Sequence, residues 1–167
     1  MKSVSRVINR EANVTEKLRA RVQSAIDTLG YVPDFAARSL AGGRSFTIGI
    51  LYDNPSPNYT MKLQSGAYKA CRANGYHLLI DHVATDRDDV AEQLASVLHN
   101  SRIDGLILTP PICDNAVILD ALEQRGIPFV RIAPASFPGR SPSVAIDDEA
   151  AARDVAQHLI DLGHRSF

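Results

Sequence analysis

The sequence has few of the features that mark specialised classes of protein. Its 167 residues include no Trp and only two cysteines, Cys71 and Cys113, which lie far apart without His or Cys neighbours at metal-ligand spacing. No run of 18 or more apolar residues occurs, and the polar N-terminal start has no apolar core. These absences argue against a disulfide framework, a cysteine metal site, a membrane span and a secretory signal. We therefore expect a cytoplasmic protein with two inert thiols.

The common catalytic signatures are also missing. The sequence contains no GxxxxGK[ST] phosphate loop, no GxGxxG after its first strand, no HExxH and no GxSxG. His77 and His82 are five apart on a predicted strand, so they should point to opposite faces and not share a metal. We predict that the protein is not an enzyme and uses no cofactor or metal.

Charge is divided unevenly along the chain. Residues 1–45 hold eight Lys and Arg against four acidic residues, whereas the remainder holds ten against fifteen. The net charge of −1 conceals this division. A basic head on an acidic body is expected if only the head meets the phosphates of a nucleic acid, although an excess of four charges is modest and could arise by chance.

Beyond residue 45 the pattern alternates between strand and helix. Apolar, β-branched segments predict strands, and amphipathic segments that end at Gly predict helices. The strands are expected at 46–52, 76–83, 103–109, 128–132 and 143–146, and the helices at 58–74, 86–100 (capped by Asp86), 114–125 and 149–162. This alternation predicts an α/β fold with a doubly wound parallel sheet, in which ligands bind beyond the carboxyl ends of the strands.

The first 45 residues are patterned as helices. Val4, Val7 and Ile8 share one face of a helix over residues 1–10, and a second helix should run from Glu16 to Leu29 and end at Gly30. A short third helix is expected from Phe35 to about Ala41, with Asp34 as its N-cap. An isolated helix of this length is marginal in water, so it should be ordered only when it packs against a partner.

The string A-A-R-S-L-A-G at 36–42 closely resembles the hinge helix of the lactose-repressor (LacI/GalR) family of bacterial transcription regulators. In that family two hinge helices pair on DNA and insert a leucine into the minor groove, which implies a wedge role for Leu40. The alternative is that Leu40 anchors an interdomain linker; the hinge stretch alone does not decide between them.

The strings S-V-S-R-V-I-N and N-V-T-E-K-L-R-A-R-V resemble the recognition helix and third helix of the same family's headpiece. The resemblance implies contacts to bases or phosphates of double-stranded DNA. The implied DNA-binding residues are Lys2, Ser3, Ser5, Arg6, Asn9, Thr15, Arg19, Tyr31, Arg38, Leu40 and Ala41. A solvated helix face would look similar, but its coincidence with the hinge makes the DNA role the better interpretation.

Two departures from the family pattern are visible. The family's headpiece has a helix and a turn before its recognition helix, whereas this sequence starts with the recognition helix at Met1. Without that first helix, Val4, Val7, Leu18 and Val22 should lose much of their apolar packing, and the headpiece should fold poorly. Asp34 replaces the usual Asn and brings an acid close to DNA. We expect the sequence to be a piece of a longer regulator or a natural truncation.

Strings such as G-I-L-Y-D-N-P, R-I-D-G-L-I-L and V-A-I-D-D resemble the first lobe of the family's sensor domain, itself similar to periplasmic sugar-binding proteins. This resemblance implies that Tyr59, Thr60, Asp114 and Asp147 contact a small effector in the cleft between two lobes. Tyr59 and Thr60 could equally be part of a helix N-terminal turn, and Asp147 a helix cap. The second lobe is not expected within this sequence.

The leading hypothesis is a sequence-specific, homodimeric or larger transcriptional regulator, most readily a repressor. It would bind a palindromic operator and respond to a sugar or related metabolite. The expected divisions are a partial helix-turn-helix headpiece (1–30), hinge and linker (31–45) and first sensor lobe (46–167). The alternatives are a sugar-binding protein of the periplasmic type without a DNA role, and an α/β enzyme such as a phosphosugar isomerase.

Overall fold

The structure is a computed structural model, and it describes residues 4, 6–7, 13–31, 43–53 and 56–166. The chain divides into two compact units, residues 1–44 and 45–167.

The first unit is built on helix α2, Glu16–Leu29. Gly30 ends it in the left-handed conformation (φ 58°), and Tyr31 donates its main-chain N–H back to Ile26 at 3.0 Å. Such a C-terminal turn satisfies carbonyls that the helix leaves open, and glycine adopts it without steric cost. The predicted bounds of this helix are confirmed. Val4, Arg6 and Val7 are also helical, whereas the predicted hinge helix at 35–41 lies outside the described residues.

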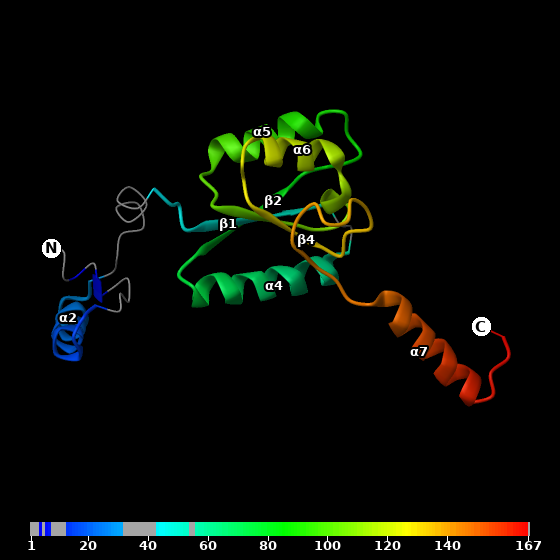
Figure 1. The fold of residues 1–167 in the computed structure, drawn as a ribbon, viewed down its shortest axis with the longest axis horizontal. Coiled ribbons are helices and arrows are strands. Elements are labelled where there is room, and N and C mark those ends of the chain that lie inside the picture. The colour runs from blue at the N-terminus through cyan, green and yellow to red at the C-terminus, as the bar shows by residue number, and fades with distance from the viewer. Residues whose placement is uncertain (1–3, 5, 8–12, 32–42, 54–55, 167) are drawn as a thin grey trace. The chain divides into compact units, whose positions relative to one another are not determined.

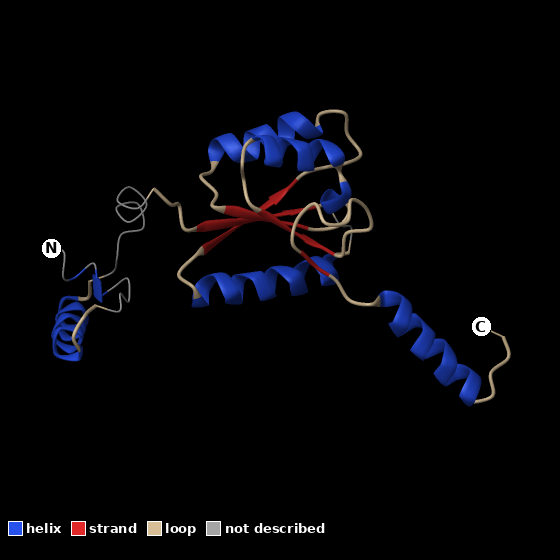
Figure 2. Cartoon of the chain, viewed as in Figure 1, coloured by secondary structure: helices blue, strands red, loops and turns tan. Residues whose placement is uncertain are grey.

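The second unit is a five-stranded parallel sheet with strand order β2-β1-β3-β4-β5. The strands are β1 (Thr47–Tyr52), β2 (His77–His82), β3 (Gly105–Leu108), β4 (Phe129–Ile132) and β5 (Ser143–Val144). Helix α4 (Pro57–Ala73) covers one face, and α5 (Val90–Asn100) and α6 (Ala116–Gln124) cover the other (Figure 1). A short helix η1 (Ile112–Asp114) precedes α6, and α7 (Asp148–Asp161) follows β5 (Figure 2). The predicted doubly wound α/β fold is confirmed.

The main core lies between the sheet and the α5/α6 layer. It includes Leu51 of β1, Leu94 of α5, Leu108 of β3 and Leu119 of α6, each at most 1% exposed. The short helix η1 adds Ile112 and Cys113 to this core, whereas α4 buries only Cys71 and α7 buries no residue. Helices α5 and α6 contribute most to the core because their apolar residues recur at helical spacing on the side that faces the sheet.

Two helix starts differ from the predictions by two residues or more, whereas α4 and α7 each begin one residue earlier than predicted. Helix α5 begins at Val90 and not at Asp86, because Thr85 is bonded to Asp53, and Gln93 bonds both main-chain groups of Ala84. These contacts hold residues 84–89 outside the helix. Helix α6 begins at Ala116, because the Asn115 side chain accepts from the N–H of Ile118 at 3.2 Å. Asp114, the predicted first residue of that helix, therefore belongs to η1.

No helix among the described residues is long and apolar enough to cross a bilayer.

Candidate effector-binding edge and helical unit

The carboxyl ends of the parallel strands meet at one edge of the sheet, where open α/β sheets bind ligands. Strand β1 ends at Tyr52, β3 at Leu108 and β4 at Ile132. Three acidic side chains lie at or near such strand ends: Asp53 directly follows β1, Asp114 lies in η1 after β3, and Asp147 lies after β5 (Ser143–Val144). The geometry of each acid decides what it is able to do there.

Asp53 fastens the end of β1 to the loop after β2. Its Oδ2 accepts the main-chain N–H of Thr85 at 2.7 Å and the hydroxyl of Thr85 at 2.5 Å, and its Oδ1 lies 3.2 Å from Nε2 of His82. Burial alone would raise the pKa of Asp53, but the hydrogen bonds from Thr85 and the nearby His82 outweigh it, and the pKa is lowered. Sequence reasoning placed Asp53 at this edge but did not single it out.

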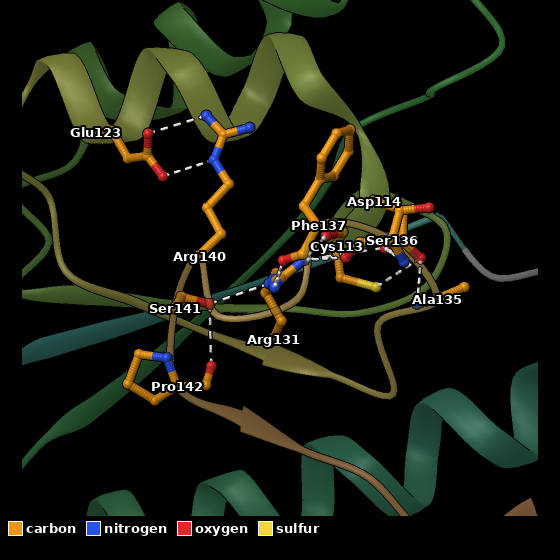
Figure 3. A network of polar contacts seen from close by, with 10 residues as sticks. All are labelled: Cys113, Asp114, Glu123, Arg131, Ala135, Ser136, Phe137, Arg140, Ser141 and Pro142. Carbon is orange, nitrogen blue, oxygen red and sulfur yellow. Dashed lines mark hydrogen bonds and ion pairs between the residues drawn. The ribbon is translucent and has the colours of Figure 1, made fainter.

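Asp114 lies at the end of η1 and holds the loop between β4 and β5, residues 133–142 (Figure 3). Its two carboxylate oxygens accept main-chain N–H groups, from Ala135 at 3.0 Å and from Ser136 at 2.8 Å. The side chain is 24% exposed, so the carboxylate is reachable from solvent. The predicted effector residue is therefore present at the edge, with part of its acceptor capacity already used.

Arg131, on strand β4, is buried beside Asp114 and is 1% exposed. Its Nε donates to Ser141 Oγ at 3.0 Å, Nη2 to the carbonyl of Phe137 at 2.6 Å, and Nη1 to the carbonyls of Ser136 (2.8 Å) and Cys113 (3.4 Å). Nη1 also lies 4.0 Å from Asp114 Oδ1. Sequence reasoning missed this residue, although an arginine within the apolar strand F-V-R-I was a visible signal of a buried polar network.

Arg140 holds the same loop from outside. It pairs with Glu123 (Nε to Oε1, 2.6 Å) and Asp120 on α6, and its guanidinium lies 5.6 Å from the ring centre of Phe137. Hydrogen bonding to Arg140 lowers the pKa of Glu123, and the two carboxylates raise the pKa of Arg140. The β4–β5 loop is thus fastened at two places by two arginines.

Tyr59 and Thr60 lie in the first turns of α4, as the alternative interpretation allowed. Burial raises the pKa of Tyr59, and Cys113 adds to the effect. The hydroxyl of Thr60 is buried without a hydrogen-bond partner among the described residues. Contact of Tyr59 and Thr60 with an effector remains a prediction.

Asp147 is exposed and caps α7, accepting the main-chain N–H of Ala150 at 2.9 Å. The cap interpretation is confirmed for this residue, and contact with an effector remains a prediction. No group of described His, Cys, Asp and Glu side chains is arranged to hold a metal ion.

In the first unit, an apolar groove of about 460 Å³ runs along α2. It is lined by Val4, Leu18, Arg21, Val22, Ala25, Ile26, Leu29 and Tyr31. Val4 is 41% exposed and α2 buries no residue, in agreement with the prediction that the apolar residues of this unit are poorly covered. Val7 is only 5% exposed, so the prediction was wrong for Val7.

The described DNA-binding candidates are spread around this unit. Arg6 is helical and exposed, Thr15 occupies the N-cap position of α2 without a side-chain cap bond, Arg19 lies 3.9 Å from Glu16, and Tyr31 is 48% exposed at the groove. The other candidates lie outside the described residues: Lys2, Ser3, Ser5, Asn9, Arg38, Leu40 and Ala41.

Comparison with known proteins adds two family matches. Residues 45–167 match the periplasmic binding proteins and sugar binding domain of the LacI family, and residues 1–34 match the bacterial regulatory proteins of the lacI family. The ribose operon repressor of Escherichia coli (strain K12) is 32% identical over 165 residues, covering 97% of this chain and 49% of that protein. The chain spans about half the length of the curated relatives it matches.

Solved structures agree on the fold. The lac repressor dimer bound to operator and the anti-inducer ONPF has a TM-score of 0.67 at 23% identity, covering 99% of this chain and 50% of that one. The transcriptional regulator CelR in complex with cellobiose has a TM-score of 0.62 at 26% identity, covering 96% and 48%.

Sheet topology and family matches together define a lobe of the periplasmic-binding-protein type that follows a helical regulatory unit. The chain belongs to the LacI family of bacterial regulatory proteins.

Proposed function

We propose that the protein acts as a sequence-specific DNA-binding transcription regulator, a repressor controlled by a sugar or related metabolite. The observation that carries the proposal is the order of the two matches in one chain. A helical unit matched to bacterial regulatory proteins precedes a lobe matched to a sugar binding domain. A sugar-binding protein without a DNA role would not need the first unit.

The names of the relatives support both halves of the proposal. One is a ribose operon repressor, one structure is a repressor dimer on its operator, and one is a regulator bound to cellobiose. By this analogy the protein binds a palindromic operator as a homodimer or larger oligomer in the cytoplasm, and it catalyses no reaction. A metabolite would change operator affinity only if it binds the two conformations of the regulator unequally.

The predicted division of labour follows the same plan. Residues 1–30 would read the operator, 31–45 would form the hinge, and 46–167 would carry the effector edge. Within that edge, Asp114 is the proposed effector contact with the best structural support, because it follows β3 and its side chain is 24% exposed. Tyr59 is proposed on resemblance and on its place in the first turn of α4. Thr60 and Asp147 are proposed on resemblance alone.

The test is selection of bound sequences from a pool of random DNA duplexes by the purified protein. A regulator of this kind selects one palindromic consensus, and Arg6→Ala relaxes preference at one position of each half-site, because arginine reads guanine through two hydrogen bonds. Arg102→Ala removes an exposed cation from the lobe and is the matched control, with unchanged preference. Recovery of unrelated sequences by the parent protein would show that the proposal is wrong.

A further inference from the structure

Arg131 is a buried arginine, whereas most arginines lie at the protein surface. At 1% exposure its charge is out of water, which is unfavourable unless every part of the group is paired. Four of the five N–H donors of a guanidinium are engaged, three of them with the β4–β5 loop at Ser136, Phe137 and Ser141. The side chain therefore has little left to offer a ligand.

The loop that Arg131 holds is conformationally demanding. Ala133 and Phe137 have φ values of 45° and 53°, in the left-handed region that side chains other than glycine rarely adopt. Such residues persist only where the surroundings fix them. The carbonyl of Phe137 is the one bonded by Arg131 Nη2 at 2.6 Å, so the arginine stabilises the turn at this strained residue.

The same loop determines the setting of Asp114. Its oxygens are 3.0 Å and 2.8 Å from the N–H groups of Ala135 and Ser136, and Ser136 is bonded through its own carbonyl to Arg131. Arg131 thus acts on Asp114 twice, through the loop and through the charge 4.0 Å away (Figure 3).

We propose that Arg131 is a positioning residue of the effector edge: it orients the Asp114 carboxylate through the β4–β5 loop and does not itself touch the effector. This inference rests on the proposed function in assigning an effector to the edge. The orienting role is a property of the lobe and is measurable without knowing the effector.

Arg140 provides the matched control. It also attaches the β4–β5 loop, but to Glu123 and Asp120 on the outside, and no bond joins it to Asp114. Arg131→Met and Arg140→Met remove the same functional group from the same loop. Only the first change should release Asp114.

Amide hydrogen exchange of the 167-residue protein, resolved by residue with NMR, measures this difference. We expect Arg131→Met to speed exchange at Ala135 and Ser136 by about tenfold or more, and Arg140→Met by less than about threefold. The N–H of Thr85, bonded by Asp53 in another loop, should be unchanged in both variants. Equal acceleration in both variants, or a larger one in Arg140→Met, would overturn the proposal.

A second readout separates positioning from general support of the fold. The ¹³C resonance of the Asp114 carboxyl should move in Arg131→Met and return only in part in Arg131→Lys, which restores a charge but not the planar fork that bonds the loop. An unmoved resonance in Arg131→Met contradicts the proposal. If Arg131→Met does not fold, Ser141→Ala removes a single Arg131 contact and should speed exchange at Ser136 about twofold to fivefold; unchanged exchange there overturns the proposal.

These outcomes are independent of the proposed function. Failure of the protein to select a DNA consensus would remove the regulator assignment and leave the Arg131 measurements intact. Conversely, an Asp114 carboxyl resonance that does not shift in Arg131→Met would contradict the positioning role and leave the operator selection intact.

Discussion

Asp53 and Thr85 are joined by two hydrogen bonds, from the main-chain N–H at 2.7 Å and from the hydroxyl at 2.5 Å. The pair ties the end of β1 to a loop 32 residues later, at the edge proposed to bind the effector. The interaction has a direct consequence for stability, because both bonds go to the charged form of the carboxyl group.

Asp53→Ala should destabilise the protein by about 1–3 kcal/mol at neutral pH, the cost of leaving bonded partners unsatisfied. Because the folded pKa of Asp53 is lowered, its contribution is present above the unfolded pKa, near 3.8, and is lost as pH falls through the folded value. Urea unfolding at neutral and acidic pH measures both effects. The gap between parent and variant should narrow as the solution is acidified; a constant gap would argue against the charged bond.

Gly49 lies in the interior strand β1, where a Cβ would be 2.6 Å from Leu106 Cδ2 and 3.3 Å from Ile103 Cδ1. Leu106 is only 2% exposed and has little room to move. We therefore expect Gly49→Ala to destabilise the protein by about 1–3 kcal/mol, the usual cost of overpacking. Chemical unfolding measures it, and an unchanged midpoint would show that the core adapts.

Gly66 is the natural control for that change. It lies in the middle of α4, and a Cβ there would meet nothing within 4 Å. Since alanine is favoured over glycine inside a helix, Gly66→Ala should stabilise the protein by about 0.5–1 kcal/mol. A loss of stability would indicate that α4 is covered at Gly66 by another surface in solution.

The two cysteines should be unreactive in the folded protein. Burial raises the pKa of Cys113 to about 12, with the charge of Asp114 adding to the effect, and burial also raises the pKa of Cys71. Thiolate is the reactive form, so a disulfide reagent such as DTNB at pH 8 should modify neither thiol until denaturant is added. Rapid modification of the Cys113→Ser variant would show that Cys71 is accessible. Rapid modification of the Cys71→Ser variant would show that Cys113 is accessible.

Leu40→Ala tests the hinge prediction, which rests on resemblance. If Leu40 wedges between base pairs, the change should weaken specific binding and reduce DNA bending, while effector affinity stays the same. DNA bending is measured by fluorescence resonance energy transfer between dyes at the two ends of a duplex. A duplex bent equally by parent and variant would favour the linker role of Leu40.

Much of the fold follows from local pattern. The bounds of α2 were predicted to the residue, because amphipathic spacing and Gly30 both mark its end, and the parallel strands were predicted from short apolar runs between helices. The start of α5 could not be predicted, because bonds from Asp53 and Gln93 hold residues 84–89 out of the helix. Those bonds depend on tertiary contacts that no local pattern encodes.

The site was predicted less completely than the fold. Asp114 was predicted as an effector contact through resemblance, but its partners are main-chain groups about 20 residues away in the sequence. Arg131 within an apolar strand indicated a buried polar network, but its partners could not be predicted, because most of them are carbonyls of an irregular loop.

The most direct test of the account compares the affinity of the protein for its selected duplex with that for a scrambled duplex of equal composition, at one fixed salt concentration. Fluorescence anisotropy is sufficient. A sequence-reading regulator should prefer the selected duplex by a factor of about 10³ or more. Equal affinity for the two duplexes would mean that the helical unit binds only phosphate charge, and would contradict the central claim.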